Sequence, residues 1–257
     1  MRALGFLHGS LLALAVGVMA GPASAGNLIT NGSFETTTAT YNDNGTTVGT
    51  VLNNSDLSGW TVGACVNYCN AGEQPFDFLV TSTLASTGVW WYPSNINAGG
   101  LVTVYASPSA SPDGGNAVGI DASNLTSPLQ QALGNLVVGD YYRLTFYQAS
   151  AQAVDSNDNT GYNGNWQVSL GSSTQTSTTM VNPFHGDTGW TQVTMTFTAT
   201  ATSELLSFLA IANVGGEPAF LLLDGVTLQD VPEPASFAVI GAGLLGVLVA
   251  RRRRRQV

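Results

Sequence analysis

The sequence predicts an all-β protein, a single β-sandwich or jelly roll flanked by an apolar segment at each end of the chain. No window between residues 27 and 230 repeats apolar residues at helical spacing with capping residues beside them. Short alternating runs rich in threonine, valine and aromatic residues fill this region instead, separated by Gly, Asn, Asp, Ser and Pro. We therefore expect a signal peptide at residues 1–25, a β-domain at 26–230 and a C-terminal membrane segment at 231–257.

The first 25 residues have the three parts of a secretory signal peptide. Arg2 supplies a positive start, residues 11–19 are apolar, and Ala23-Ser24-Ala25 has the A-x-A pattern of a cleavage site. Cleavage is expected before Gly26, so that the rest of the chain is exported. The alternative is an N-terminal anchor that persists.

The clearest strand is the run 141–148, because apolar residues alternate with polar ones along it. Leu144 and Phe146 share the face expected to meet the core, whereas Arg143 and Tyr147 share the other face. The other expected strands are residues 59–62, 76–80, 101–105, 117–120, 129–133, 166–170, 191–198, 204–212, 219–223 and 226–228.

Polar stretches between these runs are expected to be loops. Residues 36–54, rich in Thr and Asn, are expected to form a long connection. Residues 107–115 and 155–165 are rich in Gly, Pro, Asn and Asp, which favour turns.

The domain between the two ends is strongly acidic. The whole chain has a formal net charge of −9, but its basic residues gather at the ends. Arg143 is the one basic residue between 26 and 230, and fifteen acidic residues oppose it, which gives −14 with histidine neutral. Such a charge disfavours nucleic acid and anionic lipid and favours cation binding. Plain solubility of an extracellular protein explains it equally well.

Two cysteines, Cys65 and Cys69, lie four residues apart. In an exported chain the default for such a pair is a disulfide, and this one closes too small a loop to stabilise the fold strongly. Two free thiols are the alternative. A metal site at these cysteines is not expected, because it would need more soft ligands and His185 is the only histidine left after the signal peptide.

The C-terminal segment resembles a membrane span followed by a cytoplasmic anchor. Residues 235–250 carry no charge, and as a helix they would span about 24 Å, slightly less than a hydrocarbon core. The arginines that follow are hard to translocate, so they are expected to stay cytoplasmic and to hold the folded domain outside. A buried helix with a solvated basic tail is the alternative.

These residues closely resemble the PEP-CTERM sorting signal of Gram-negative bacteria. The resemblance rests on Val231-Pro232-Glu233-Pro234-Ala235-Ser236, the apolar run, and the arginine cluster. It implies recognition by an exosortase-type membrane protease, cleavage near the motif, and delivery to the cell surface or the exterior. The residues it assigns to sorting are Pro232, Glu233, Pro234, Arg251, Arg252, Arg253, Arg254 and Arg255.

Pieces spread over the β-domain resemble the galactose-binding-like jelly-roll superfamily, which includes many carbohydrate-binding modules and a wall-associated family of unknown function. They are Asn31-Gly32-Ser33-Phe34-Glu35, Gly59-Trp60-Thr61, Asp113-Gly114-Gly115-Asn116, Tyr142-Arg143-Leu144, Gly189-Trp190-Thr191 and Leu223-Asp224-Gly225-Val226. The resemblance implies a galactose-binding-like jelly-roll β-sandwich. The chain departs from it where many relatives have two acids in place of Asp224-Gly225.

The same resemblance implies that the first and last strands lie side by side with a structural calcium near them. Its carboxylate ligands here would be Glu35 and Asp224, because calcium prefers several hard oxygen ligands. The alternative is that both carboxylates only accept hydrogen bonds from the backbone.

No catalytic motif is present. The sequence lacks a Gly-x-Ser-x-Gly elbow, a His-Glu-x-x-His pair, a phosphate loop and a Cys-x-x-Cys pair. His185 has Asp187 beside it, but a single loop histidine is not expected to be a catalytic base. We do not expect an enzyme.

A ligand-binding face is the more plausible functional feature. Sugars stack on aromatic rings. Besides Tyr147, the aromatic candidates are Trp90, Trp91, Tyr92, Tyr105 and Trp166, and burial in the core is expected for most of them. Arg143 and Tyr147 are the preferred ligand-binding residues because they share the outward face of one strand. We expect a non-enzymatic exported protein that associates with extracellular polysaccharide. The alternatives are a structural or adhesive biofilm-matrix protein with no glycan site and, more weakly, a polysaccharide-acting enzyme.

Overall fold

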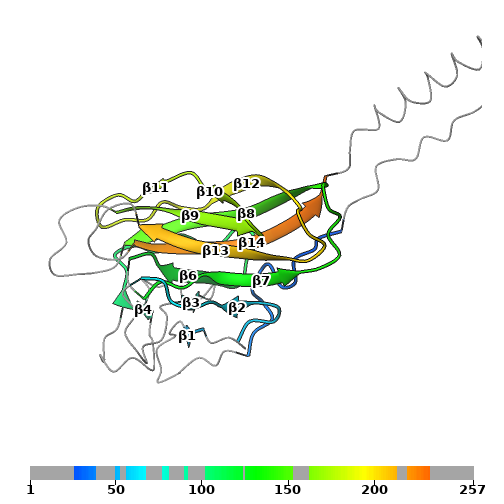
Figure 1. Ribbon diagram of the computed structural model, residues 1–257. Coiled ribbons are helices and arrows are strands. Elements are labelled where there is room, and N and C mark those ends of the chain that lie inside the picture. The colour runs from blue at the N-terminus through cyan, green and yellow to red at the C-terminus, as the bar shows by residue number, and fades with distance from the viewer. Residues whose placement is uncertain are drawn as a thin grey trace, which may run out of the picture.

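A computed structural model shows the protein as two antiparallel β-sheets packed face to face (Figure 1). The structure describes residues 26–38, 50–52, 56–67, 77–80, 90–91, 102–123, 125–152, 162–212 and 219–231. Strands are the only regular secondary structure in these described residues, so the predicted all-β sandwich is confirmed.

The first sheet contains the longest strands of the protein. Its neighbours pair antiparallel throughout. In spatial order the strands are β1 (Thr50–Val51), β3 (Asp77–Val80), β6 (Ala117–Asp121), β14 (Ala219–Asp230), β8 (Tyr141–Gln152) and β12 (Thr191–Thr198).

The second sheet faces the first and is also antiparallel. Its strands in spatial order are β10 (Ser173–Thr176), β9 (Asn163–Leu170), β13 (Glu204–Ala212), β7 (Leu129–Leu133) and β2 (Thr61–Val62). The short strand β11 (Met180–Val181) also pairs with β9, and β4 (Trp90–Trp91) pairs with β5 (Val102–Thr103) apart from both sheets.

The main core lies between the two sheets and is centred on Phe208 of β13. Its ring centroid lies 5.2 Å from that of Phe146, 6.1 Å from Trp60 and 6.2 Å from Trp166, all in tilted or edge-on contacts. Such contacts contribute about 1 kcal/mol each beyond the area they bury. The inward-facing residues of β8 predicted from its alternation, Leu144 and Phe146, belong to this core.

A second apolar cluster covers the outer face of the first sheet at one end. Phe78 of β3 meets Phe220 of β14 with ring centroids 5.8 Å apart, and Ala149 and Ala151 of β8 pack with them. Trp190 closes the cluster and donates its indole N–H to the carbonyl of Ser109 at 2.7 Å. Both faces of β8 are therefore buried along its second half.

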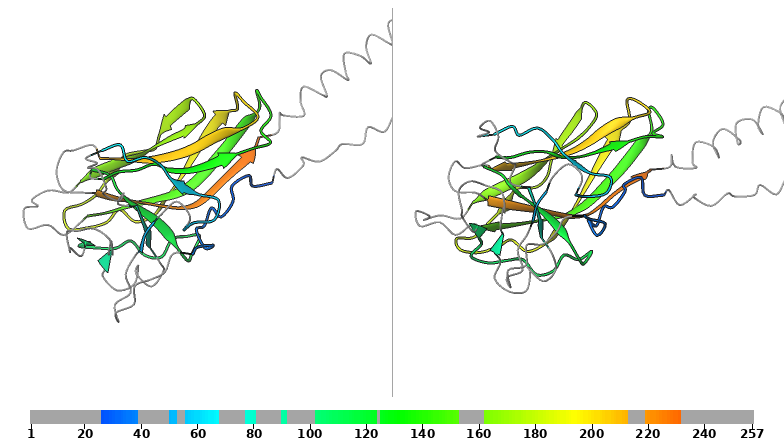
Figure 2. Two further views of the ribbon diagram at one scale, coloured as in Figure 1. Left: turned by 60° about the horizontal axis from the view of Figure 1, so that its bottom comes forward. Right: turned by 90° about the horizontal axis from the view of Figure 1, so that it is seen from below.

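The N-terminal segment runs along the last strand, β14 (Figure 2). The resemblance implied that the first and last strands would be neighbours, but this segment is not a strand, and the first strand, β1, pairs with β3 instead. The Leu28 N–H donates to the Leu228 carbonyl at 2.9 Å, and the Leu228 N–H donates to the Asn27 side chain at 3.0 Å. Further along, the Val226 N–H donates to the Gly32 carbonyl at 2.9 Å.

Several strand boundaries predicted from the sequence were wrong. Residues 219–223 and 226–228 form one strand, β14, whose register shifts between Asp224 and Thr227 at a bulge. Gly225, with φ of 60°, absorbs this irregularity. Strand β8 continues to Gln152, beyond the predicted end at Gln148. The prediction stopped early because the later residues are buried on both faces and lack the alternation by which a strand is recognised.

Four strands were not predicted at all. One of them is β4, which pairs with β5. β1 lies inside the expected long connection 36–54, and its Thr50 pairs with Leu79 of β3. β10 and β11 both pair with β9. These strands span only two to four residues, too few for alternation to be visible.

The two terminal segments predicted from the sequence, residues 1–25 and 232–257, lie outside the described residues. Within the part that the structure describes, no helix has the length and apolar character needed to cross a membrane.

Candidate functional site

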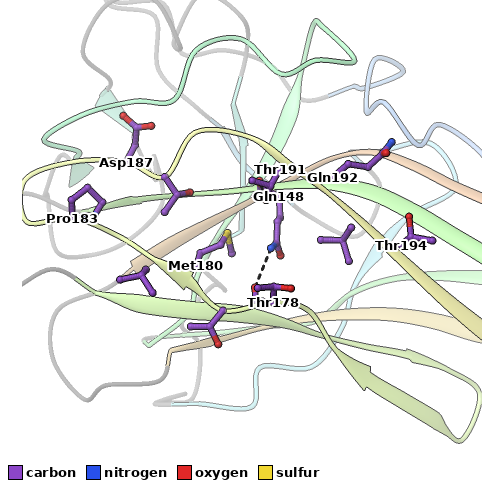
Figure 3. A pocket seen from close by; sticks show the side chains of 12 residues that line it. Gln148, Thr178, Met180, Pro183, Asp187, Thr191, Gln192 and Thr194 are labelled. Carbon is purple, nitrogen blue, oxygen red and sulfur yellow. Dashed lines mark hydrogen bonds between the residues drawn. The ribbon is translucent and has the colours of Figure 1, made fainter.

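A groove of about 580 Å³ opens at one edge of the sandwich, between β12 and the segment from Thr178 to Thr188 (Figure 3). It is lined mainly by uncharged hydrogen-bonding side chains: five threonines and two glutamines among twelve residues. Asp187 contributes the one carboxylate, and none of these lining residues is aromatic or basic. Such a lining suits a ligand that offers many neutral hydrogen-bonding groups.

Gln148 is a buried polar residue of this groove. It sits on β8 opposite Thr191 of β12 and Leu223 of β14, so it points to the inner side of the first sheet. Its Nε2 donates to the Thr178 carbonyl at 3.0 Å, an interaction that crosses the groove (Figure 3). Its Oε1 is buried and has no hydrogen-bond partner. An unpaired buried acceptor of this kind costs about 1–3 kcal/mol.

Hydrogen bonds hold the groove wall in place. The Thr188 hydroxyl accepts the Ser150 N–H at 2.9 Å, and the Thr188 N–H donates to the Ser150 carbonyl at 3.0 Å. Asp187 accepts the Gly189 N–H at 2.8 Å through Oδ1. The wall is therefore fixed to β8, and the groove is a preformed feature.

A cluster of acidic side chains lies elsewhere, where the N-terminal segment meets the loop before β6. The Oε1 of Glu35 accepts the Asn116 N–H at 2.6 Å, and the Asn116 side chain donates to the Phe34 carbonyl at 3.2 Å. A side chain at Gly115, whose φ is 69°, would overlap the Glu35 carboxylate. The chain therefore needs glycine at Gly115 to bring this loop against Glu35.

Asp224 is the buried member of the acidic cluster. Its side chain has 0% exposure, and neither carboxylate oxygen has a hydrogen-bond partner. Burial raises the pKa of Asp224 to about 7, opposed in part by the nearby Ser111 hydroxyl and Gly225 amide, which lie outside good hydrogen-bond geometry. The negative charges of Asp113 and Glu35 raise this pKa further.

The structure thus brings Glu35 and Asp224 into one region, together with Asp113. Their carboxylate oxygens have the chemistry that calcium prefers. However, no three His, Cys, Asp or Glu side chains of the described residues are grouped as a metal site. A calcium ion here would need backbone carbonyls or water as further ligands.

Asp113 was missed as an acidic neighbour, although the sequence carried a signal. It starts the run Asp113-Gly114-Gly115-Asn116, and both glycines have positive φ, which permits a tight turn. Nothing in the sequence alone places that turn against Glu35.

Tyr147 and Arg143 do share the outer face of β8, as predicted. The Tyr147 ring lies against Gly225, where an added Cβ would come 2.8 Å from Cδ2 of Tyr147 and 3.2 Å from Cβ of Asp113. Arg143 is exposed, opposite Thr196 of β12. Tyr147 therefore lies beside the acidic cluster, Arg143 lies further along the strand, and neither lines the groove.

The structure gives different outcomes for the remaining predicted site residues. Trp166 is fully buried in the core, so it is not a binding residue. The side chains of Trp90 and Trp91, all of Tyr92, and the sorting residues from Pro232 onward lie outside the described residues. Cys65 is in a disulfide, but Cys69 lies outside the described residues, so the Cys65–Cys69 pairing stays a prediction.

Gln148 was missed as a site residue. It was predicted only as the end of a strand. A glutamine on a strand face whose other residues are apolar is nevertheless a signal of a buried polar function. The segment that forms the opposite wall comes from residues about thirty positions later in the chain, and no sequence pattern pairs the two.

Two protein-family models match the chain. The PEP-CTERM protein-sorting motif matches residues 230–255, and a protein family of unknown function, DUF642, matches residues 27–90. Neither description names a catalytic activity. No curated protein matches the chain.

Solved structures of low sequence identity align with much of the chain, at TM-scores below 0.5. The carbohydrate-binding module TmCBM61, solved with β-1,4-galactotriose, aligns over 80% of this chain and 100% of its own, with 13% identity and a TM-score of 0.39. A structure described as "CBM4 structure and function" aligns over 79% and 99%, with 15% identity and a TM-score of 0.37. The K1 cleaved adhesin domain of Lys-gingipain from Porphyromonas gingivalis W83 aligns over 68% and 92%, with 14% identity and a TM-score of 0.39.

The family match at the C-terminus coincides with the residues that carried the predicted sorting signal. The chain therefore bears a PEP-CTERM protein-sorting motif, which indicates an exported protein that is held at the membrane before it is processed.

Proposed function

We propose that this protein is a non-enzymatic, exported protein that binds extracellular polysaccharide through the groove beside β12. The observation that carries the proposal is Gln148, whose buried Oε1 has no partner while its Nε2 spans the groove to Thr178. That oxygen is buried in the free protein, so a sugar hydroxyl can donate to it only when the Gln148 side chain turns toward the groove. The surrounding threonine hydroxyls can accept or donate further hydrogen bonds.

The sorting motif supports the extracellular part of the proposal. Its counterpart in the cell is an exosortase-type membrane protease, which would cut near Pro232, Glu233 and Pro234 and release the domain to the surface or the exterior. Polysaccharide is an abundant ligand there, and a strongly acidic domain is poorly suited to nucleic acid or anionic lipid.

We also propose that calcium occupies the acidic cluster as a structural ion. Glu35 and Asp224 would hold it, with Asp113 beside them. Calcium would neutralise the buried carboxylate of Asp224 and fix the N-terminal segment against β14, but it would take no part in sugar binding.

The test is retention on polysaccharides in native affinity gels, with the full chain purified in detergent. Gln148→Met, which keeps the side chain's volume but removes its polar atoms, should weaken binding by about tenfold. Gln229→Met, at an exposed glutamine of β14, is the matched control and should bind as the wild type does. If the wild type is retained by no polysaccharide, the protein is a structural or adhesive matrix protein instead.

A further inference from the structure

Three aromatic rings are stacked at the surface, two from the loop that precedes Asp187 and one from Tyr105 in the segment after β5. The His185 ring lies between two others: its centroid is 3.6 Å from that of Phe184 at 26°, and 3.6 Å from that of Tyr105 at 23°. Phe184 is the outer ring of this stack and remains 50% exposed. A half-exposed phenylalanine whose other face is already occupied presents a flat apolar surface to solvent.

Hydrogen bonds hold the turn that carries this stack. The Gly186 N–H donates to the Pro183 carbonyl at 3.0 Å, and the Asn182 side chain donates to the Gly186 carbonyl at 3.0 Å. The His185 N–H donates to Oε1 of Gln152 at 2.6 Å, which ties the turn to β8. The position of Phe184 is therefore fixed from both the backbone and the ring stack.

The turn lies at one end of the groove. Pro183 and Asp187, the residues that flank Phe184 and its turn, both line the groove and lie at the end opposite Thr194 (Figure 3). The groove itself has no aromatic lining residue. Phe184 thus supplies, next to the groove, the aromatic surface that the groove lacks.

We propose that Phe184 is an aromatic subsite that stacks the apolar face of a sugar ring, while the next sugar of the same chain lies in the groove beside Gln148. This inference rests on the proposed function. Sugar rings whose hydroxyls are equatorial expose C–H groups on both faces, and these pack on flat aromatic rings. Because the stack already immobilises Phe184, binding costs little side-chain entropy.

The charge of the site selects a neutral polysaccharide. The groove has a carboxylate, Asp187, and no basic residue. The surrounding domain has a single arginine, Arg143, on the outer face of β8, against fifteen acidic residues. A uronic acid or sulfated chain would meet repulsion without any cation to offset it. The ligand class is therefore a neutral hexose polymer long enough to cover both subsites.

The experiment compares full-length variants in detergent against soluble neutral β-glucan, neutral galactan and alginate in native affinity gels. Phe184→Ala should weaken binding to the neutral chain by about tenfold, and Phe184→Trp should retain it. Tyr141→Ala is the matched control, because Tyr141 is a similarly exposed aromatic residue, at 53%, on the outer face of β8. It should bind as the wild type does, and alginate should retain none of the proteins.

Each other outcome has a distinct meaning. Wild-type binding that Phe184→Ala leaves unchanged overturns the aromatic subsite but not the proposed function. If Tyr141→Ala weakens polysaccharide binding and Phe184→Ala does not, the binding site lies on the outer face of β8, and the aromatic subsite at Phe184 is overturned. Equal retention by alginate overturns the selection of neutral chains, and no retention by any polymer overturns the proposed function itself. Far-ultraviolet circular dichroism and melting curves exclude loss of folding as the cause.

Discussion

The backbones of Gly32 and Val226 lie in direct contact, where the N-terminal segment meets the last strand. The Val226 N–H donates to the Gly32 carbonyl at 2.9 Å, and a Cβ built on Gly32 would overlap the Val226 carbonyl oxygen. This contact lies just after the bulge at Gly225 and next to the acidic cluster, so it joins both ends of the exported domain at the proposed calcium site.

Gly32→Ala is therefore expected to destabilise the protein strongly. The new methyl group would meet a backbone atom, which cannot rotate away, so the two segments must separate at a cost of about 3 kcal/mol. Gly134→Ala is the control, because an added Cβ there meets nothing within 4 Å. Urea unfolding of the two variants measures the difference. Equal midpoints would show that the N-terminal segment is not held as described.

The buried Asp224 makes stability depend on pH. Its pKa is raised from 3.8 to about 7 in the folded protein, so the folded state holds this proton more tightly than the unfolded chain does. The associated stabilisation is complete below about pH 4 and is lost as the pH rises through 7. In chelator, Asp224→Asn should therefore gain in melting temperature relative to the wild type between pH 5 and pH 8.

Asp77 of β3 must be separated from this effect. It is fully buried, and burial, with the nearby charge of Asp121, raises its pKa well above the usual range, opposed in part by the Ser127 amide, which lies outside good hydrogen-bond geometry. Asp77 contributes a pH dependence of the same sign in the wild type and in Asp224→Asn. The difference in melting temperature between these two proteins therefore isolates the contribution of Asp224. A constant difference across this pH range would contradict the assignment.

Calcium is expected to raise the melting temperature by binding only the native state. At a calcium concentration one hundred times the dissociation constant, the gain is about 2.7 kcal/mol. The double variant Glu35→Ala, Asp224→Ala should lose the response. The response should also grow with pH, because calcium competes with the proton on Asp224. Identical melting of the wild type in calcium and in chelator would show that the site does not exist.

The sequence was sufficient for the two-sheet fold because most strands alternate. In β12, Met195 and Phe197 are buried while Thr194 and Thr196 are exposed, and this pattern of period two is visible without a structure. The same reasoning placed Arg143 and Tyr147 correctly on the outer face of β8. It failed in the second half of that strand, where Ala149 and Ser150 are buried on opposite faces.

The groove could not be predicted in the same way. Its wall depends on the long-range approach of Thr178 to Gln148 and on β11, which has two residues. Neither leaves a periodic pattern. The acidic cluster was partly predictable, because the resemblance named Glu35 and Asp224, but Asp113 joins them only through the fold of the glycine turn.

The arginines at the C-terminus should set the orientation of the precursor. Arginines resist translocation, so they stay cytoplasmic and keep the β-domain on the other side of the membrane. Replacing Arg251, Arg252, Arg253, Arg254 and Arg255 with glutamine should release or mislocalise the precursor. Cell fractionation with protease protection measures this. A correctly oriented precursor without the five arginines would show that the apolar run alone sets the orientation.

Glu233 lies between two prolines. Proline has no N–H donor and favours an extended backbone in the residue before it, so an extended segment is expected here. An extended, unpaired segment next to the bilayer is a suitable substrate for a membrane protease. Changing Pro232, Glu233 and Pro234 to alanine should therefore leave the protein in the membrane and uncut, whereas the wild type should lose its arginines and reach the surface or the medium. Mass spectrometry of surface-exposed and released protein decides the matter. Intact Arg255 on surface-exposed wild-type protein would refute cleavage and leave a simple C-terminal anchor.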